Sequence, residues 1–219
     1  MNGTMENARP ADPRLRGLYA ITDAALCARH GGVVAAATRV LEAGVKLLQY
    51  RDKTDEHARR GKEVAALAEL CATHGALLIV NDDLELARMS GAAGVHLGAA
   101  DGDPSVARNW LGDDAIIGVS CYADLARAQR AAAAGADYLA FGSVQASASK
   151  PDAPRAPLDV FTEARPLGRP LCAIGGIMPT HVAALRAAGA DMLAVITGVF
   201  DAKDPAKAAR AYLAELSRT

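Results

Sequence analysis

Short apolar runs of strand length alternate with alanine-rich runs of helical length along nearly the whole chain. The apolar runs are almost continuous, which is typical of parallel strands that are buried on both faces of a sheet. Eight of these runs predict strands, at residues 17–22, 45–50, 76–81, 94–97, 115–120, 138–142, 171–175 and 192–197.

Eight helical runs separate and follow these strands, and several end at a glycine, the usual C-terminal stop of a helix. They are residues 31–44, 55–75, 84–91, 104–112, 123–135, 158–165, 179–189 and 204–217. Regular alternation of strand and helix implies parallel strands joined by crossover helices. Eight such units in 219 residues predict an α/β fold, a single (β/α)8 or TIM barrel, with the active site at the C-terminal ends of the strands. An open, doubly wound sheet is the competing architecture, but no GxGxxG motif follows the first strand.

Composition and charge narrow the class of protein. The formal net charge is −1, which argues against a nucleic-acid partner, and no apolar run reaches the ~18 residues of a membrane span. The four cysteines are scattered and form no CxxC pair, so we expect buried free thiols in a reducing, cytoplasmic setting. Residues 1–16 are polar and lack the apolar stretch of a signal peptide. We interpret them as a loose N-terminal extension of a barrel domain at 17–219.

Polar and charged residues gather at the C-terminal ends of the predicted strands. In the stretch LLQYRDK, Gln49, Arg51 and Lys53 occupy alternate positions and therefore share one face of an extended chain. The stability of a barrel requires no such row, and other strand ends also carry reactive or ligand-binding groups. These are Asn81, Asp82 and Asp83, Asp101, Ser120, the loop residues Ser147, Ser149 and Lys150, the glycines Gly175 and Gly176, and Thr197 with Gly198.

The types of residue at these ends indicate phosphate chemistry. The turns after the last two strands form a common phosphate site in TIM barrels, and the paired glycines there would let backbone N–H groups approach an anion. Arg51, Lys53 and Lys150 would face a second anion across the mouth of the barrel. Asp82 and Asp101 follow adjacent strands, and two carboxylates beside phosphates are a usual way to hold Mg²⁺. The residues alone therefore predict two phosphorylated groups, one of them bound with Mg²⁺.

Structural explanations compete at single positions. Asp82 or Asp83 could cap the helix at 84–91, and Asp83 is the better placed of the two. His96 lies on an apolar strand, where a histidine is more often a satisfied core residue than a ligand. The convergence of all these strand ends in one barrel mouth is what favours a functional site.

The segments GLYAITD, LLQYRDK, LIVNDD, GVHLG, IIGVSCY and AIGGI, with the serine-lysine loop, resemble the thiamine-phosphate synthase family from Arg16 to the last helix. The resemblance implies a (β/α)8 barrel and a transferase. This family joins a hydroxymethylpyrimidine pyrophosphate to a hydroxyethylthiazole phosphate, releases pyrophosphate and yields thiamine monophosphate. The two predicted anions would then belong to two small-molecule substrates. The sequence leaves open whether the chain forms a homo-oligomer.

The resemblance also implies roles for individual residues. The pyrimidine and its pyrophosphate would be held by Gln49, Arg51, Lys53, Asn81 and Ser120. The wider substrate-binding set adds Tyr50, Asp52, the loop residues Ser147, Ala148, Ser149 and Lys150, and, for the thiazole phosphate, Gly176, Ile196 and Thr197. The catalytic set would be Arg51, Lys53, Lys150 and Ser120, and the Mg²⁺ ligands Asp82 and Asp101. The reaction stabilises a leaving pyrophosphate, so it would require no protein nucleophile.

The chain departs from the family pattern in two places. Ala99 stands where the family often has glutamine, and in the loop after the sixth strand the departures are Ser143, Gln145 and Ser149. The competing functions are a thiazole tautomerase-like relative, a non-catalytic binder of thiazole phosphate or thiamine phosphate, and an isomerase or aldolase barrel. Retention of the carboxylates and cations favours the synthase, because a tautomerase needs no pyrophosphate site.

Overall fold

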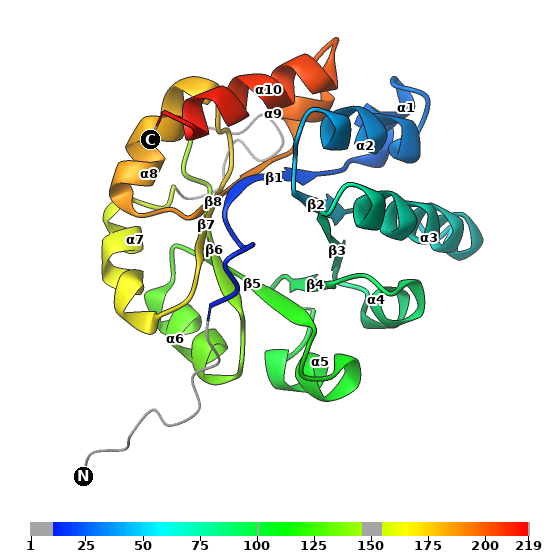
Figure 1. Ribbon diagram of the computed structural model, residues 1–219. Coiled ribbons are helices and arrows are strands. Elements are labelled where there is room, and N and C mark those ends of the chain that lie inside the picture. Colours follow the sequence, from blue (N-terminus) through cyan, green and yellow to red (C-terminus); the bar gives the residue numbers. More distant parts are fainter. Residues whose placement is uncertain (1–10, 100, 146–154, 219) are drawn as a thin grey trace.

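Parallel strands close into a barrel in the order in which they occur along the chain, and helices surround them (Figure 1). The computed structural model describes residues 11–99, 101–145 and 155–218. The strands are β1 (Gly17–Ile21), β2 (Leu47–Tyr50), β3 (Leu77–Asn81), β4 (Gly94–Leu97), β5 (Ile116–Tyr122), β6 (Tyr138–Gly142), β7 (Leu171–Ile174) and β8 (Met192–Val195). The predicted barrel and every predicted strand are confirmed, although the last strand ends at Val195 rather than at residue 197.

The predicted helices are confirmed as well. They are α2 (Val33–Glu42), α3 (His57–Thr73), α4 (Leu84–Ser90), α5 (Pro104–Leu111), α6 (Leu125–Ala133), α7 (Asp159–Ala164), α8 (Val182–Ala188) and α10 (Pro205–Leu216). The structure adds the short helices α1 (Ala24–Ala28) and α9 (Thr197–Phe200) and the 3₁₀ turns η1 (Arg165–Leu167) and η2 (Pro179–His181). Segments of about one turn are too short to show helical periodicity, which is why the apolar pattern does not predict them.

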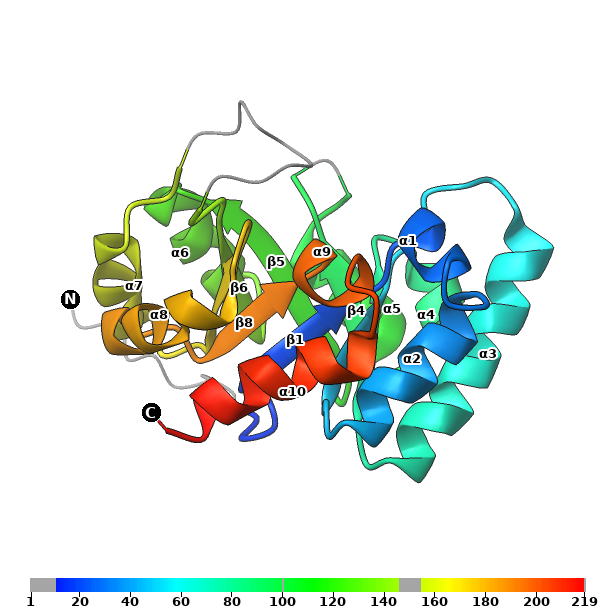
Figure 2. The same cartoon turned by 90° about the horizontal axis from the view of Figure 1, so that it is seen from above.

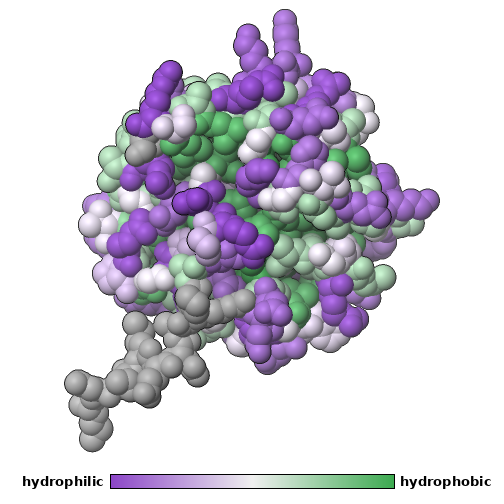
Figure 3. Space-filling model, in the orientation of Figure 1, coloured by the Kyte–Doolittle hydropathy of each residue, from purple (hydrophilic) through white to green (hydrophobic). Residues whose placement is uncertain are grey.

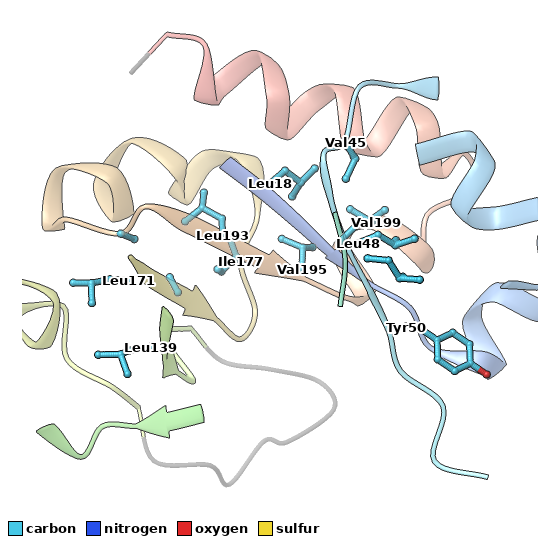
Figure 4. Packing of buried hydrophobic residues seen from close by; sticks show 14 of the residues in the cluster. Leu18, Val45, Leu48, Tyr50, Leu139, Leu171, Ile177, Leu193, Val195 and Val199 are labelled. Carbon is cyan, nitrogen blue, oxygen red and sulfur yellow. The ribbon is translucent and has the colours of Figure 1, made fainter. Parts of the chain in front are cut away.

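Buried side chains form two layers, one inside the barrel and one between the strands and the helices. Successive residues of a strand face opposite sides, so Tyr19 of β1 joins the inner layer and its neighbour Leu18 the outer one. Figure 4 shows part of the outer layer, which includes Leu48 and Tyr50 of β2. Leu15 is buried in the inner layer, so this part of the predicted loose extension packs against the barrel. The predicted domain boundary otherwise stays a prediction.

The parallel arrangement brings the C-terminal ends of all the strands to one end of the barrel, which we call the mouth. The last helix, α10, packs against α2 and β1, beside the pairing of β1 with β8 (Figure 2). Each strand end is therefore held by hydrogen-bonded strands on both sides and by a helix behind it. This gives the residues at the mouth a rigid support.

The cysteines at positions 27, 71, 121 and 172 are buried free thiols, as predicted. Burial raises the pKa of Cys27 to about 11 and the pKa of Cys71 and of Cys121 to about 12. These thiols are therefore protonated at neutral pH, and a protonated thiol is a poor nucleophile.

The surface shown in Figure 3 is mixed, and most of the side chains that protrude from it are hydrophilic. Within the described residues no helix is both long and apolar enough to cross a membrane.

Candidate active site

Two carboxylates lie side by side at the mouth, one after β3 and one after β4. Asp82 directly follows β3 with a left-handed backbone (φ 63°), and its N–H donates to the carbonyl oxygen of His96 at 2.8 Å. The carboxylate of Asp101 accepts a hydrogen bond of 2.9 Å from the N–H of Gly98. Burial, and then the adjoining carboxylate of Asp101, raise the pKa of Asp82 above its ordinary value. The pair repels itself when both groups are ionised, so the site favours a cation.

A cation in the loop after β2 already faces this pair. Lys53 Nζ lies 3.5 Å from Asp82 Oδ2, and the Lys53 side chain is 62% exposed. Asn81, the last residue of β3, donates from its side-chain amide to the same carboxylate. Together with Asp83 and Arg60, these residues line a hollow of about 250 Å³ at the edge of the mouth. The hollow combines positive, negative and amide groups, which suits a phosphate bound with a metal ion.

Asp83 has a different role, as the sequence indicates. Its Oδ1 accepts from the N–H of Leu86 at 2.9 Å, so Asp83 is the N-cap of α4. Its other oxygen pairs with Arg60 at 2.9 Å. The interpretation of Asp83, rather than Asp82, as the cap is confirmed.

Arg51 is positioned by residues at the end of β1. Its backbone N–H donates to the buried hydroxyl of Thr22 at 2.9 Å, and its Nη1 lies 3.6 Å from Asp23 Oδ2. Asp23 also caps α1 by accepting from the N–H of Leu26. The Arg51 side chain is still 30% exposed, and ion pairs of this kind are weak, so its charge remains available to an anion.

Tyr50 and Asp52, two of the predicted substrate-binding residues, have side chains that pair with residues of α3. Tyr50 Oη donates to Glu63 at 2.7 Å, and Asp52 lies 2.8 Å from Arg59 Nη2. Both line a second hollow, of about 240 Å³, between β2 and the helices. The structure therefore places the Tyr50 side chain away from the hollow at the edge of the mouth, whereas Asp52 lines both hollows.

A series of buried polar groups crosses the barrel interior below the mouth. Gln49 Nε2 donates to the hydroxyl of Tyr19 at 2.7 Å, and the hydroxyls of Tyr19 and Tyr138 are 2.9 Å apart. Tyr138 Oη lies 2.9 Å from His96 Nδ1, and His96 Nε2 lies 2.8 Å from Ser120 Oγ. Burial lowers the pKa of His96 to about 4, so its imidazole is neutral at physiological pH. His96 has partners on both nitrogens, which confirms that it is a satisfied core histidine.

The turns after β7 and β8 lie next to one another, because these two strands are paired. Gly175 and Gly176 have φ of 105° and 62°, in the left-handed region that favours glycine. A Cβ on Gly175 would also lie 2.2 Å from the hydroxyl of Ser143, so the turn is packed closely against the end of β6. Ile196 follows β8, and the exposed Thr197 begins α9. Gly176, Ile196 and Thr197 are thus brought to one side of the mouth.

Some supporting residues carry no signal in the sequence. Arg127 of α6 donates to the carbonyl oxygen of Ser120 at 2.7 Å and to that of Gly98 at 3.0 Å, and so ties the ends of β4 and β5 together. Thr22 and Asp23 are different, because they are the last two residues of the motif GLYAITD and directly follow β1. Their polarity at a strand end could have marked them as partners of the next strand end.

Several predicted positions belong to the loop after β6. Ser147, Ala148, Ser149 and Lys150 lie outside the described residues. Of the positions that depart from the family pattern, Ala99 is exposed, and the Ser143 hydroxyl donates to the carbonyl oxygen of Gln145 at 2.5 Å.

The closed parallel barrel, with paired carboxylates, cations and glycine turns at the C-terminal ends of its strands, defines the class of TIM-barrel enzymes. Comparison with known families is more specific. A family model described as thiamine monophosphate synthase matches residues 18–199, and the chain belongs to this family.

Individual relatives agree with this assignment. The chain is 51% identical over 199 residues to the thiamine-phosphate synthase of Chromobacterium violaceum, which covers 91% of this chain and 95% of the relative. It is 53% identical over 198 residues to that of Thioalkalivibrio sulfidiphilus, covering 90% and 93%. Among solved structures, a thiamine phosphate pyrophosphorylase from Pyrococcus furiosus superposes with a TM-score of 0.85 at 31% identity, covering 94% of this chain and 98% of that one. The predicted family is confirmed, and with it the prediction of a transferase of thiamine biosynthesis.

Proposed function

We propose that this chain condenses a hydroxymethylpyrimidine pyrophosphate with a hydroxyethylthiazole phosphate to form thiamine monophosphate and pyrophosphate. The observation that carries the proposal is the meeting of Asp82, Asp101 and Lys53 at one side of the mouth, in a chain of this family. The glycine turns after β7 and β8 supply a second anion site in the same mouth. The reaction has two phosphorylated substrates, which matches two such sites.

The donor set fits Mg²⁺. Asp82 and Asp101 offer carboxylate oxygens that lie close enough to raise the pKa of Asp82, and a divalent ion between them would relieve this repulsion. Within residues 11–99, 101–145 and 155–218 no cluster of three or more His, Cys, Asp or Glu side chains could hold a metal. Mg²⁺ typically uses one or two carboxylates and completes its shell with water and substrate phosphates. When bound, it would neutralise negative charge on the pyrophosphate.

The chain's own residues would act on the substrates mainly through charge. Arg51 and Lys53, with Lys150, stabilise the charge that develops on the departing pyrophosphate. Gln49 and Ser120 hold the pyrimidine ring, whose amino group stabilises the positive methylene left behind. The thiazole nitrogen then attacks this methylene, and its phosphate is held by backbone N–H groups near Gly176 and Thr197. No protein nucleophile takes part, consistent with thiols that stay protonated.

The test is turnover of the two substrates with Mg²⁺ and with a chelator. We expect pyrophosphate release and thiamine phosphate formation only with the metal. Binding of the thiazole phosphate without product would instead support a tautomerase-like relative or a non-catalytic binder. Product formation would also show that Ala99 and Gln145 are tolerated.

Gly98→Ala is expected to raise the Mg²⁺ concentration that gives half-maximal rate by roughly tenfold, the effect of losing about one well-placed ligand interaction. A Cβ at this position would lie 2.3 Å from Asp101 Oδ2 and displace that carboxylate. The clashing atom is the end of a flexible side chain, so the barrel should keep its melting temperature within a few degrees. Titration of activity with Mg²⁺ checks this.

Gly61→Ala makes the same chemical change on α3, where nothing lies within 4 Å of the added methyl group, and is the matched control. An unchanged Mg²⁺ requirement in Gly98→Ala would contradict the placement of Asp101 as a ligand.

A further inference from the structure

The hydrogen bonds of the buried polar series from Gln49 to Ser120 all run in one direction, which follows from counting the donors and acceptors of its members. Tyr19, Tyr138 and His96 lie between these two residues, and Tyr19 and Tyr138 are 1% and 0% exposed. A phenol hydroxyl has one proton to donate, and a neutral imidazole has one donor and one acceptor nitrogen. Each of the two buried phenol protons therefore needs an acceptor within the series.

The donor at one end sets the direction of every later bond. Gln49 Nε2 donates to Tyr19, so the Tyr19 proton must go to Tyr138, its remaining partner among the described residues. The Tyr138 proton then goes to Nδ1 of His96. His96 must consequently carry its proton on Nε2 and donate it to Ser120 Oγ. Reversal of the link between Tyr19 and Tyr138, or of the link between Tyr138 and His96, would leave a fully buried phenol proton without an acceptor, which proteins avoid.

The two ends of the series have opposite hydrogen-bonding character; Ser120 is partly exposed, and Gln49 is buried. Ser120 accepts from His96, so its own proton is free to be donated toward the mouth. Gln49 uses its amide nitrogen on Tyr19, so its amide oxygen is left as an acceptor. Turning the Gln49 amide over would reverse all the bonds together, so the two ends would still differ from each other.

We propose that Tyr19, Tyr138 and His96 are positioning residues that make Ser120 a hydrogen-bond donor and Gln49 an acceptor toward one ring of the substrate. This inference rests on the proposed function, because the ring it fits is an aminopyrimidine. An aminopyrimidine carries an amino donor beside a ring-nitrogen acceptor. The series therefore recognises the donor and acceptor pattern of the pyrimidine, and not only its shape or its pyrophosphate.

The first experiment determines the direction of the hydrogen bonds in the series and does not depend on enzymatic turnover. Histidine labelled with ¹⁵N reports which ring nitrogen carries the proton, and a His96→Asn variant identifies the His96 signal among the five histidines. We expect the Nε2–H form of His96 in the ligand-free protein. A proton on Nδ1 would overturn the proposed direction.

The second experiment removes one link. Tyr138→Phe deletes the donor that holds His96 in the Nε2–H form, so the Ser120 hydroxyl is free to turn inward. We expect mixed His96 tautomers and a KM for the pyrimidine pyrophosphate raised roughly tenfold, as for the loss of one aligned hydrogen bond. The KM for the thiazole phosphate and the Mg²⁺ requirement should not change.

Tyr212→Phe is the matched control, since it also removes a buried phenol hydroxyl, one that donates to Ile177 at 2.8 Å outside the series. It should change neither the His96 tautomer nor the KM for the pyrimidine pyrophosphate. An active wild-type protein whose Tyr138→Phe variant keeps both values would overturn this inference. A wild-type protein without turnover would instead refute the proposed function, and the ¹⁵N measurement would still decide the direction of the series.

Discussion

Asp101→Ala is expected to lower Mg²⁺-dependent turnover by roughly 10³-fold while leaving the barrel folded, since a metal ion contributes several kcal/mol to stabilising transition-state charge. Asp101 lies in the loop after β4, and its carboxylate accepts from the N–H of Gly98 outside the buried core. Burial is the larger cause of the raised pKa of Asp82, and removal of Asp101 ends the repulsion that adds to it. The melting temperature of the metal-free protein should therefore stay the same or rise.

The measurement is turnover against Mg²⁺ concentration, with thermal unfolding in parallel. Asp103→Asn is the matched control, because Asp103 is a nearby carboxylate that caps α5 by accepting from the N–H of Ser105. Asparagine also caps helices, so this variant loses the charge and keeps the fold. Full activity of Asp101→Ala would remove Asp101 from the metal site.

Arg51→Ala is expected to reduce kcat/KM for the pyrimidine pyrophosphate by roughly 10- to 100-fold, the value of one or two charge-assisted hydrogen bonds. The KM for the thiazole phosphate should change much less, because the glycine turns follow β7 and β8, which are separated from β2 by β1. Arg51→Lys should recover only part of the loss, since lysine keeps the charge but not the two-pronged geometry.

Steady-state kinetics with each substrate varied in turn checks this expectation. Arg130→Ala is the control, because Arg130 is 70% exposed in the last turn of α6, and the helices of a barrel run back toward the end opposite the mouth. Equal losses for both substrates in Arg51→Ala would refute the division of the mouth into two anion sites.

Much of the site could be predicted because it depends on local order along the chain. Chain position makes Asp83 the cap of α4, as predicted, whereas β2 ends at Tyr50, so the shared face of Gln49, Arg51 and Lys53 stays a prediction. Tyr50 donates to Glu63 and Asp52 pairs with Arg59, contacts with α3 that local order does not reveal, and the place of these two residues in the substrate-binding set stays a prediction.

Other features depend on contacts between residues far apart in the sequence. Tyr19 and Tyr138 are 119 positions apart, yet their hydroxyls meet inside the barrel. Which inward residues share a level depends on the stagger of neighbouring strands, and hydrophobic periodicity does not encode this stagger. The partners of His96 and the pairing of Arg51 with Asp23 therefore become visible only in three dimensions.

By itself, the sequence determined the barrel, the order of its strands and the chemical character of the mouth, because buried strands, helix caps and strand ends are recorded in residues close together along the chain. The tertiary structure alone decided that Asp82 takes a left-handed backbone and that a directed series of buried groups joins Gln49 to Ser120. The physical reason is that closure and stagger of the barrel set these distances, and both are properties of all the strands together.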